Sequence, residues 1–167
     1  LQATTDAEAA LQQAVAGFVG SASRVTDLFA GCGTLGLPLL KGLSKLTAAE
    51  SDTAALAAMK AAVAAAGLGA RLDCIEADLM RAPLTANLFG DVEAVIIDPP
   101  RAGASAQCEI LSTTAVPAIA MVSCNPASFA RDAAILLAGS YRLTSLQIID
   151  QFRFSSHVEI VARLERG

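Results

Sequence analysis

The sequence lacks several features that would assign it to a broad class of protein. No apolar run is long enough to span a bilayer, and the N-terminus does not have the basic, apolar and small-residue order of a secretory signal. Its four cysteines include no C-x-x-C pair, so we expect no bound metal. Free thiols without a signal sequence indicate a reducing compartment, and we expect a cytoplasmic protein that does not contact a membrane.

Basic residues are also sparse. The chain has 12 lysines and arginines against 16 aspartates and glutamates, and a formal net charge of -4 at pH 7. A protein that binds nucleic acid by itself usually carries a basic patch, because neutralising phosphates supplies much of the affinity. If this chain acts on a nucleic acid, most of the binding must come from another region. Nothing in the sequence indicates an obligate protein partner.

The size of the chain suits one domain. Its 167 residues and 54% hydrophobic content can fill a sizeable core. No linker, repeat or low-complexity segment divides the chain. Because it begins at Leu1 rather than at methionine, we expect residues 1–167 to be one domain excised from a longer protein.

Strand-like and helix-like segments alternate along the sequence. Strands are predicted at 24–29, 45–49, 71–77, 91–97, 118–123, 141–149 and 158–164. Helices are predicted at 9–19, from the glycine turn at 31–36, and at 53–66, 107–113 and 126–138. This alternation predicts an α/β fold with a mostly parallel seven-stranded sheet and helices on both faces. A short loop joins the last two strands, so we expect them to form an antiparallel pair.

Noteworthy residues follow five successive predicted strands. They are Asp27 beside the glycine turn, then Glu50, Asp78, Asp98 and Cys124. The carboxyl ends of parallel strands meet at one edge of a sheet, and ligands bind beyond that edge. The sequence therefore predicts a functional site there.

The glycine turn indicates a nucleotide cofactor. Residues 31–36 read G-x-G-x-x-G, a pattern shared by folds that bind NAD, FAD or S-adenosylmethionine. Glu50 follows the first glycine by about twenty residues, where an acid would accept hydrogen bonds from ribose hydroxyls. Residues 27–33 resemble the first motif of class I methyltransferases, whose cofactor S-adenosylmethionine carries ammonium and sulfonium charges. Asp78 matches the position that often contacts adenine in that class; a cap in a loop is its alternative role.

A second motif, Asp98-Pro99-Pro100-Arg101, follows the fourth predicted strand. Methyltransferases that act on exocyclic amines carry a similar motif that continues with a tyrosine or phenylalanine, which stacks on the base. Arg101 cannot stack in that manner and offers a charge with a hydrogen-bonding fork. The motif therefore argues against methylation of an amine.

Taken in order, the motifs resemble the RNA 5-methyluridine methyltransferase family. They are Asp98-Pro-Pro-Arg-Ala-Gly, Val122-Ser-Cys-Asn-Pro with Arg131-Asp132, and Phe152 with His157-Val-Glu. The resemblance covers nearly the whole chain and implies a Rossmann-like class I fold that uses S-adenosylmethionine. It also implies an RNA substrate, tRNA or rRNA. In that family an N-terminal RNA-binding region, often an OB-like barrel, precedes the catalytic domain, and only the latter is matched here.

The resemblance implies a role for each matching position. Cys124 would be the nucleophile and Glu159 the base. The cofactor would be held by Gln2, Asp27, Phe29, Gly31, Gly33, Thr34, Glu50, Asp78 and Asp98. The substrate would be contacted by Arg101, Phe152 and His157. The sequence departs from the family pattern at Arg153-Phe154, where Pro-His is usual, and this bears on the shape of the base-side pocket.

This chemistry requires one nucleophile and one base. Carbon 5 of uracil becomes nucleophilic once a thiolate has added to carbon 6, and a base must afterwards remove the proton from carbon 5. We expect Arg101 and the helix that opens at Pro126 to favour the thiolate of Cys124. Cys74 and Cys108 are expected to be buried and inert, and Cys32 to be small filler in the glycine turn.

Three other interpretations remain open at this point. An NAD-type oxidoreductase would rest on the glycine turn and Glu50 alone. A non-catalytic module could hold the cofactor or an RNA partner, although the presence of both Cys124 and Glu159 argues against it. A methyltransferase acting on amines or small molecules would leave the thiol idle.

Overall fold

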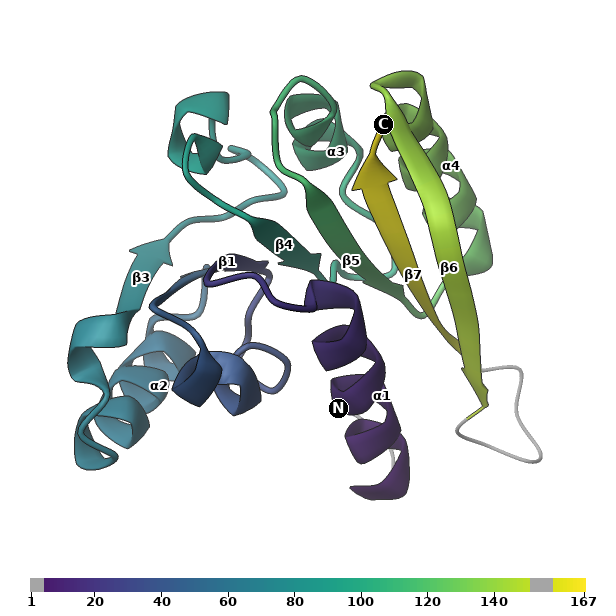
Figure 1. The fold of residues 1–167 in the computed structure, drawn as a ribbon. Helices are drawn as coiled ribbons and strands as arrows, with labels where there is room; N and C mark the ends of the chain where they lie inside the picture. The colour runs from purple at the N-terminus through teal and green to yellow at the C-terminus, as the bar shows by residue number, and fades with distance from the viewer. Residues whose placement is uncertain (1–4, 151–157) are drawn as a thin grey trace.

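A computed structural model describes residues 5–150 and 158–167 of the chain. Within these residues the strands form one seven-stranded sheet in the order β3-β2-β1-β4-β5-β7-β6 (Figure 1). The strands are β1 (Arg24–Leu28), β2 (Lys45–Glu50), β3 (Leu72–Glu76), β4 (Ala94–Ile97), β5 (Ala118–Ser123), β6 (Tyr141–Asp150) and β7 (Val158–Arg166). Strands β1 to β5 pair in parallel, whereas β7 is antiparallel to both β5 and β6. The predicted fold class is confirmed.

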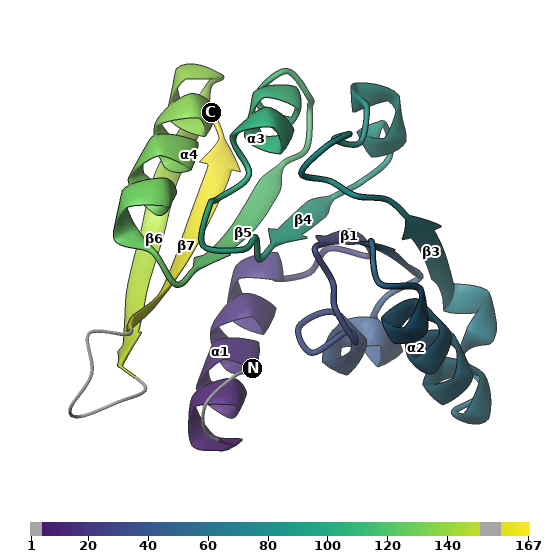
Figure 2. The same cartoon turned by 180° about the vertical axis from the view of Figure 1, so that it is seen from behind.

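Helices cover both faces of the sheet (Figures 1 and 2). One face carries α1 (Thr5–Val19), the short 3-10 helix η1 (Leu37–Gly42) and α2 (Thr53–Ala65), and the other carries α3 (Ser105–Ser112) and α4 (Pro126–Ala138). Two further 3-10 turns are η2 (Gly69–Arg71) and η3 (Ala86–Phe89). None of the helices in the described part of the chain is long and apolar enough to cross a bilayer.

The central strands are buried on both sides, which explains their uninterrupted apolar sequences. In β4, Val95 and Ile97 belong to the core beneath α3 and α4, whereas Ala94 and Ile96 belong to the core beneath α1. This alternation arises because successive side chains of a strand point to opposite faces. All residues of β5 are buried in the same way. A parallel strand with two covered faces therefore appears in the sequence as a continuous apolar run.

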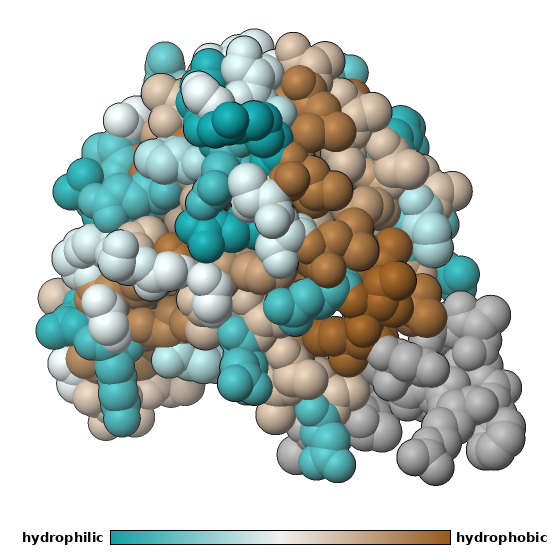
Figure 3. Space-filling model, turned by 45° about the vertical axis from the view of Figure 1, so that its right-hand side comes forward, coloured by the Kyte–Doolittle hydropathy of each residue, from teal (hydrophilic) through white to brown (hydrophobic). Residues whose placement is uncertain are grey.

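The edge strand β6 is different. Its side chains Leu143, Leu146 and Ile148 are exposed by 44%, 45% and 64%. Figure 3 shows apolar residues gathered on this side of the molecule. The cofactor-side residues lie elsewhere, around the carboxyl ends of β1 to β4.

Helix starts agree with the capping residues of the sequence. The Asn125 side chain accepts a hydrogen bond from the Ala127 N–H (3.0 Å), and Pro126 occupies the first position of α4, as predicted. The helix predicted from the glycine turn is wrong. Residues 31–36 form turns, and the 3-10 helix η1 follows with Pro38 in its first turn. An α-helix that began in the glycine turn would place Pro38 in its interior, where proline breaks the helix.

Candidate active site

The carboxyl edge of the sheet brings the predicted site residues together. Glu50 ends β2, Asp98 directly follows β4, and Cys124 directly follows β5. Asp27 lies one residue before the end of β1, and Asp78 lies two residues beyond β3. Because β1 to β5 are parallel, all five residues approach the same edge.

A hollow of about 720 Å³ lies at this edge. Six of the predicted cofactor residues line it: Asp27, Phe29, Gly31, Thr34, Glu50 and Asp98. Its remaining lining was not predicted and consists of Glu8, Ala30, Cys32, Leu35, Asp52 and Ala55. For two of these residues, the sequence position could have indicated that they face the hollow. Cys32 stands between two glycines of a ligand-facing turn, and Glu8 lies in the first turn of a helix.

A smaller hollow of about 260 Å³ shares Phe29 and Glu50 with the larger one. Asp78 lines this smaller hollow, together with Met80 and Pro100. The Asp78 Oδ1 atom also accepts a hydrogen bond from the Met80 N–H (3.1 Å). Asp78 therefore lies in a loop turn and also lines a hollow, so its position agrees with both of the alternatives that the sequence left open.

The remaining two predicted cofactor residues lie differently. Gly33 does not line either hollow, and its φ of +88° together with the nearby Leu37 side chain leaves no room for a Cβ. Gly33 therefore determines the shape of the turn and does not line the hollow. Gln2 lies outside the described residues.

Asp27 is the most unusual group in the larger hollow. Its side chain is 1% exposed, and within the described residues neither carboxylate oxygen has a donor in full hydrogen-bond geometry, although the Gly36 N–H is close enough to lower the pKa of Asp27 slightly against the effect of burial. Burial, followed by the charge of Asp98, raises the pKa of Asp27 to about 8. A buried carboxylate without partners is costly. The hollow therefore suits a ligand that brings a cation or hydrogen-bond donors to this point.

Glu50 is held by its neighbours. Its Oε1 atom accepts hydrogen bonds from the Ser51 N–H (2.6 Å), the Ser51 hydroxyl (2.9 Å) and the Asp52 N–H (3.0 Å). Its Oε2 atom accepts one from the Gly31 N–H (2.9 Å). Burial raises the pKa of Glu50, but these donors outweigh burial, and the net pKa is lowered. The carboxylate is therefore ionised and fixed in direction, and Oε2 retains capacity for a further donor.

Cys124 lies beside Glu159. The antiparallel register of β5 and β7 sets Ser123 opposite Ile160, so the next position on each strand brings Cys124 and Glu159 to the same edge. Cys124 is partly exposed rather than buried in the core. Its sulfur is thus placed at the edge of the sheet that the proposed chemistry requires.

The protonation state of Cys124 differs from the expectation. Burial and then the charge of Glu159 raise the pKa of the thiol, while Arg101 lowers it. Arg101 acts in the predicted direction, but the net shift is upward, so the predicted preference for thiolate is wrong for the unliganded site. Glu159 also acts on Asp98, whose pKa rises to about 7, mainly because of burial.

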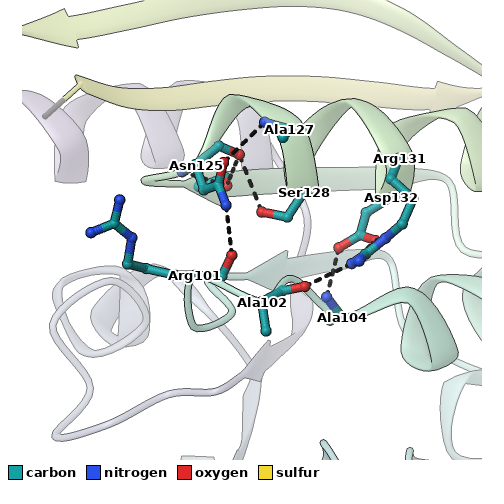
Figure 4. A network of polar contacts seen from close by, with 9 residues as sticks. Arg101, Ala102, Ala104, Asn125, Ala127, Ser128, Arg131 and Asp132 are labelled. Atoms are coloured by element: carbon teal, nitrogen blue, oxygen red, sulfur yellow. Dashed lines mark hydrogen bonds and ion pairs between the residues drawn. The ribbon is translucent and has the colours of Figure 1, made fainter. Parts of the chain in front are cut away.

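The other predicted residues are distributed as follows. Arg101 is exposed, and Figure 4 shows its guanidinium pointing away from the polar network that holds its backbone. Phe152 and His157 lie outside the described residues. Cys108 is fully buried, as expected, and burial raises its pKa to about 12. Cys74 is only partly buried, and Cys32 is exposed at the larger hollow, so the view of Cys32 as filler is wrong.

Comparison with known proteins adds independent information. The family model described as tRNA (Uracil-5-)-methyltransferase matches residues 85–167. An uncharacterized RNA methyltransferase from Rhizobium meliloti is 44% identical over 165 residues, which are 99% of this chain and 40% of the relative. The 23S rRNA (uracil(1939)-C(5))-methyltransferase of Halomonas elongata is 36% identical over 153 residues, 88% of this chain and 30% of the relative.

A solved structure is similar as well. The tRNA (uracil-54, C5)-methyltransferase of Pyrococcus abyssi, in complex with S-adenosyl-L-homocysteine, superposes with a TM-score of 0.82 at 28% identity. The match covers 98% of this chain and 39% of that one. The chain thus spans about two fifths of the length of these relatives. None of these matches supports the NAD-type oxidoreductase or the amine methyltransferase, and the chain belongs to the tRNA (uracil-5-)-methyltransferase family.

Proposed function

We propose that this chain is the catalytic domain of an enzyme that methylates carbon 5 of a uridine in tRNA or rRNA. The methyl donor would be S-adenosylmethionine, and the reaction would pass through a covalent bond between Cys124 and the base. One observation carries the proposal: a partly exposed cysteine and a glutamate share the sheet edge at which acidic residues line a cofactor-sized hollow.

The two hollows suit the parts of the proposed cofactor. The unpartnered carboxylate of Asp27 suits an ammonium group, because a cation would compensate its burial. Glu50 suits a ribose hydroxyl, since its Oε2 atom accepts one hydrogen bond and has room for another. Asp78 lies in the smaller hollow, on the far side of Phe29 and Glu50, where it suits adenine. The relative from Pyrococcus abyssi, which has the same fold, binds S-adenosyl-L-homocysteine.

Cys124 and Glu159 would divide the chemistry between them. Cys124 would lose its thiol proton to solvent, and the thiolate would add to carbon 6 of uracil and leave an enolate that makes carbon 5 nucleophilic. S-adenosylmethionine would supply the methyl group at its sulfonium centre. Glu159 would then take the proton from carbon 5, and elimination would free the sulfur. The target base must leave its stack to reach Cys124, which is easiest in a single-stranded loop.

The RNA would be held mainly by a part of the protein other than residues 1–167. This chain is acidic overall, and its relatives are more than twice its length. Those relatives include enzymes named for 23S rRNA and for tRNA, so both remain candidate substrates. We place the enzyme in the cytoplasm, with RNA as its partner.

The test is a covalent trap. RNA that contains 5-fluorouridine cannot lose a proton at carbon 5, so the full-length protein with S-adenosylmethionine should form an adduct that survives denaturation. Cys124→Ala should abolish the adduct, whereas Cys74→Ala should retain it, because Cys74 lies within β3 and lines neither hollow. An adduct that persists in Cys124→Ala would overturn the nucleophile assignment.

A further inference from the structure

The start of α4 holds the loop that follows Asp98 (Figure 4). The Asn125 side-chain amide donates to the Arg101 carbonyl (2.9 Å), and Arg131 Nη2 donates to the Ala102 carbonyl (2.8 Å). The Ala104 N–H donates to Asp132 Oδ2 (2.6 Å). Three backbone groups within residues 101–104 are thus bound by the N-cap side chain of α4 and by two side chains from the middle of that helix. We call these three residues the α4 clamp (Asn125, Arg131 and Asp132).

Asp132 is the centre of the α4 clamp. Its side chain is completely buried, and its second oxygen, Oδ1, is bound by Arg131 through Nε (2.8 Å) and Nη2 (2.6 Å). The Arg131 side chain is 48% exposed, so only the Asp132 end of the ion pair is buried. Both oxygens of that buried carboxylate accept hydrogen bonds, and this holds the carboxylate in one geometry. The arrangement is therefore suited to fixing the position of the loop.

Gly103 allows the loop to lie directly against α4. Its φ is +79°, and a Cβ there would overlap Arg131 Nη2 and Asp132 Oδ2 and would lie 2.9 Å from Ser128 Cβ. A side chain at this position would push the loop away from the helix. The close approach of the loop to α4 thus depends on Gly103 in the loop and on Arg131 and Asp132 in the helix.

The α4 clamp connects two residues of the proposed chemistry, Cys124 and Arg101. Asn125 directly follows Cys124, and the backbone that it binds is that of Arg101. We propose that Asn125, Arg131 and Asp132 are positioning residues that hold the main chain of residues 101–104 beside the segment that carries Cys124, and with it the base of the Arg101 side chain. This inference rests on the proposed function, because it gives Arg101 a task at the nucleophile.

The charges around the thiol support this role. Glu159 and Asp98 raise the pKa of Cys124, as burial does, and Arg101 opposes them. Glu159 enters from β7, Asp98 from the end of β4, and Arg101 from the clamped loop. A loop that moved would weaken the effect of Arg101 and leave the two carboxylates in place.

The experiment measures the alkylation rate of Cys124 as a function of pH, by mass spectrometry of the peptide that contains it. Asn125→Ser keeps an oxygen that can cap α4 but removes the amide that binds Arg101. Asp132→Asn removes the charge that binds Arg131. In both variants Cys124 should be alkylated about threefold more slowly than in the wild type at pH values below the midpoint of the Cys124 titration. Arg101→Gln should slow alkylation by the same factor. Neither should slow alkylation further in an Arg101→Gln background, because the effect passes through Arg101.

The matched control is Gln107→Met. The buried Gln107 side chain binds another loop in the same manner, with bonds to the Leu84 N–H (2.8 Å) and the Leu84 carbonyl (3.2 Å). This variant should lower the melting temperature and leave the alkylation of Cys124 unchanged. If the clamp variants behave like Gln107→Met, or if Arg101→Gln has no effect, the inference is overturned.

The measurement needs neither RNA nor cofactor. Its failure would therefore leave the 5-fluorouridine trap to decide the proposed function separately. If Asp132→Asn does not fold, Asn125→Ser decides the question alone, since it leaves the ion pair between Arg131 and Asp132 intact. The clamp variants should also retain the S-adenosylmethionine affinity of the wild type, because the larger hollow lies on other residues.

Discussion

Gly36 and Asp27 approach so closely that a Cβ on Gly36 would lie 2.5 Å from Asp27 Oδ2. The third glycine of the turn therefore makes room for the buried carboxylate at the cofactor hollow. Gly36→Ala should displace Asp27 and weaken S-adenosylmethionine binding by about tenfold, which corresponds to the loss of one charge-assisted contact. Isothermal titration calorimetry would measure the affinity.

The matched control for this change is Gly42→Ala. A Cβ at Gly42 would meet no heavy atom within 4 Å, so this variant should bind the cofactor as the wild type does. Equal affinity in Gly36→Ala and Gly42→Ala would show that the position of Asp27 does not matter for binding.

Asp27 should also make stability depend on pH. Its pKa is raised from 3.8 to about 8, so the folded state binds the proton more tightly than the unfolded state does. The free energy of unfolding should therefore fall as pH rises from about 4 to 8, by an amount on the order of several kcal/mol. Asp27→Asn cannot ionise and should remove much of this slope. Asp98, with its pKa raised to about 7, should account for part of the remainder.

Urea denaturation of both proteins at pH 5 and pH 8 would measure the effect. The loss of stability between these two values should be clearly larger in the wild type than in Asp27→Asn. Equal losses would mean that Asp27 finds a partner or solvent in solution, and the argument for an unpartnered carboxylate would fail.

Much of the fold could be predicted because its causes are local. A parallel strand covered on both faces needs apolar side chains throughout, and residues 118–123 show this directly. Asn125 and Pro126 mark a helix start by their own chemistry. The helix expected from the glycine turn failed for an equally local reason, because it would have placed Pro38 in its interior, and the prediction took only the glycines into account.

The electrostatics of the site could not be predicted in the same way. The sequence predicts a thiol shifted toward thiolate, since Arg101 and a helix start accompany Cys124. In the structure, β7 brings Glu159 next to Cys124 although the two residues are far apart in the sequence, and the thiol is partly buried. Together these two effects raise the pKa of Cys124, where the sequence predicted that it would be lowered. The burial of Asp27 without a well-aligned hydrogen-bond donor among residues 5–150 and 158–167 is also a property of three-dimensional packing that no residue pattern reveals.

Glu159→Gln should have two opposite effects. The charge of Glu159 raises the pKa of Cys124, so its removal should lower that pKa and speed alkylation of the thiol below the midpoint. In the full-length enzyme the same change removes the proposed base. Ordinary uridine RNA should then accumulate as a denaturation-resistant adduct, because carbon 5 keeps its proton after methyl transfer.

Glu165→Gln serves as the control for Glu159→Gln. Glu165 belongs to the same strand but lies toward its other end. It forms an ion pair with Arg163 in which both side chains are about one third exposed, a contact of small energetic value. Glu165→Gln should leave both the alkylation rate of Cys124 and the turnover of RNA unchanged. Faster alkylation without an adduct would assign the proton transfer to another residue.

The isolated chain of residues 1–167 should bind S-adenosylmethionine but methylate RNA poorly. The residues of the two hollows are all present, whereas 16 acidic residues outnumber 12 basic ones, and RNA binding depends on neutralising phosphates. We expect kcat/KM to fall on the order of a hundredfold relative to the full-length protein, with the loss concentrated in KM. Transfer of a radiolabelled methyl group to RNA transcripts at low and moderate salt would measure both constants. Full activity of the isolated chain at moderate salt would show that its own surface suffices to hold the substrate, and that the regions beyond it serve another purpose.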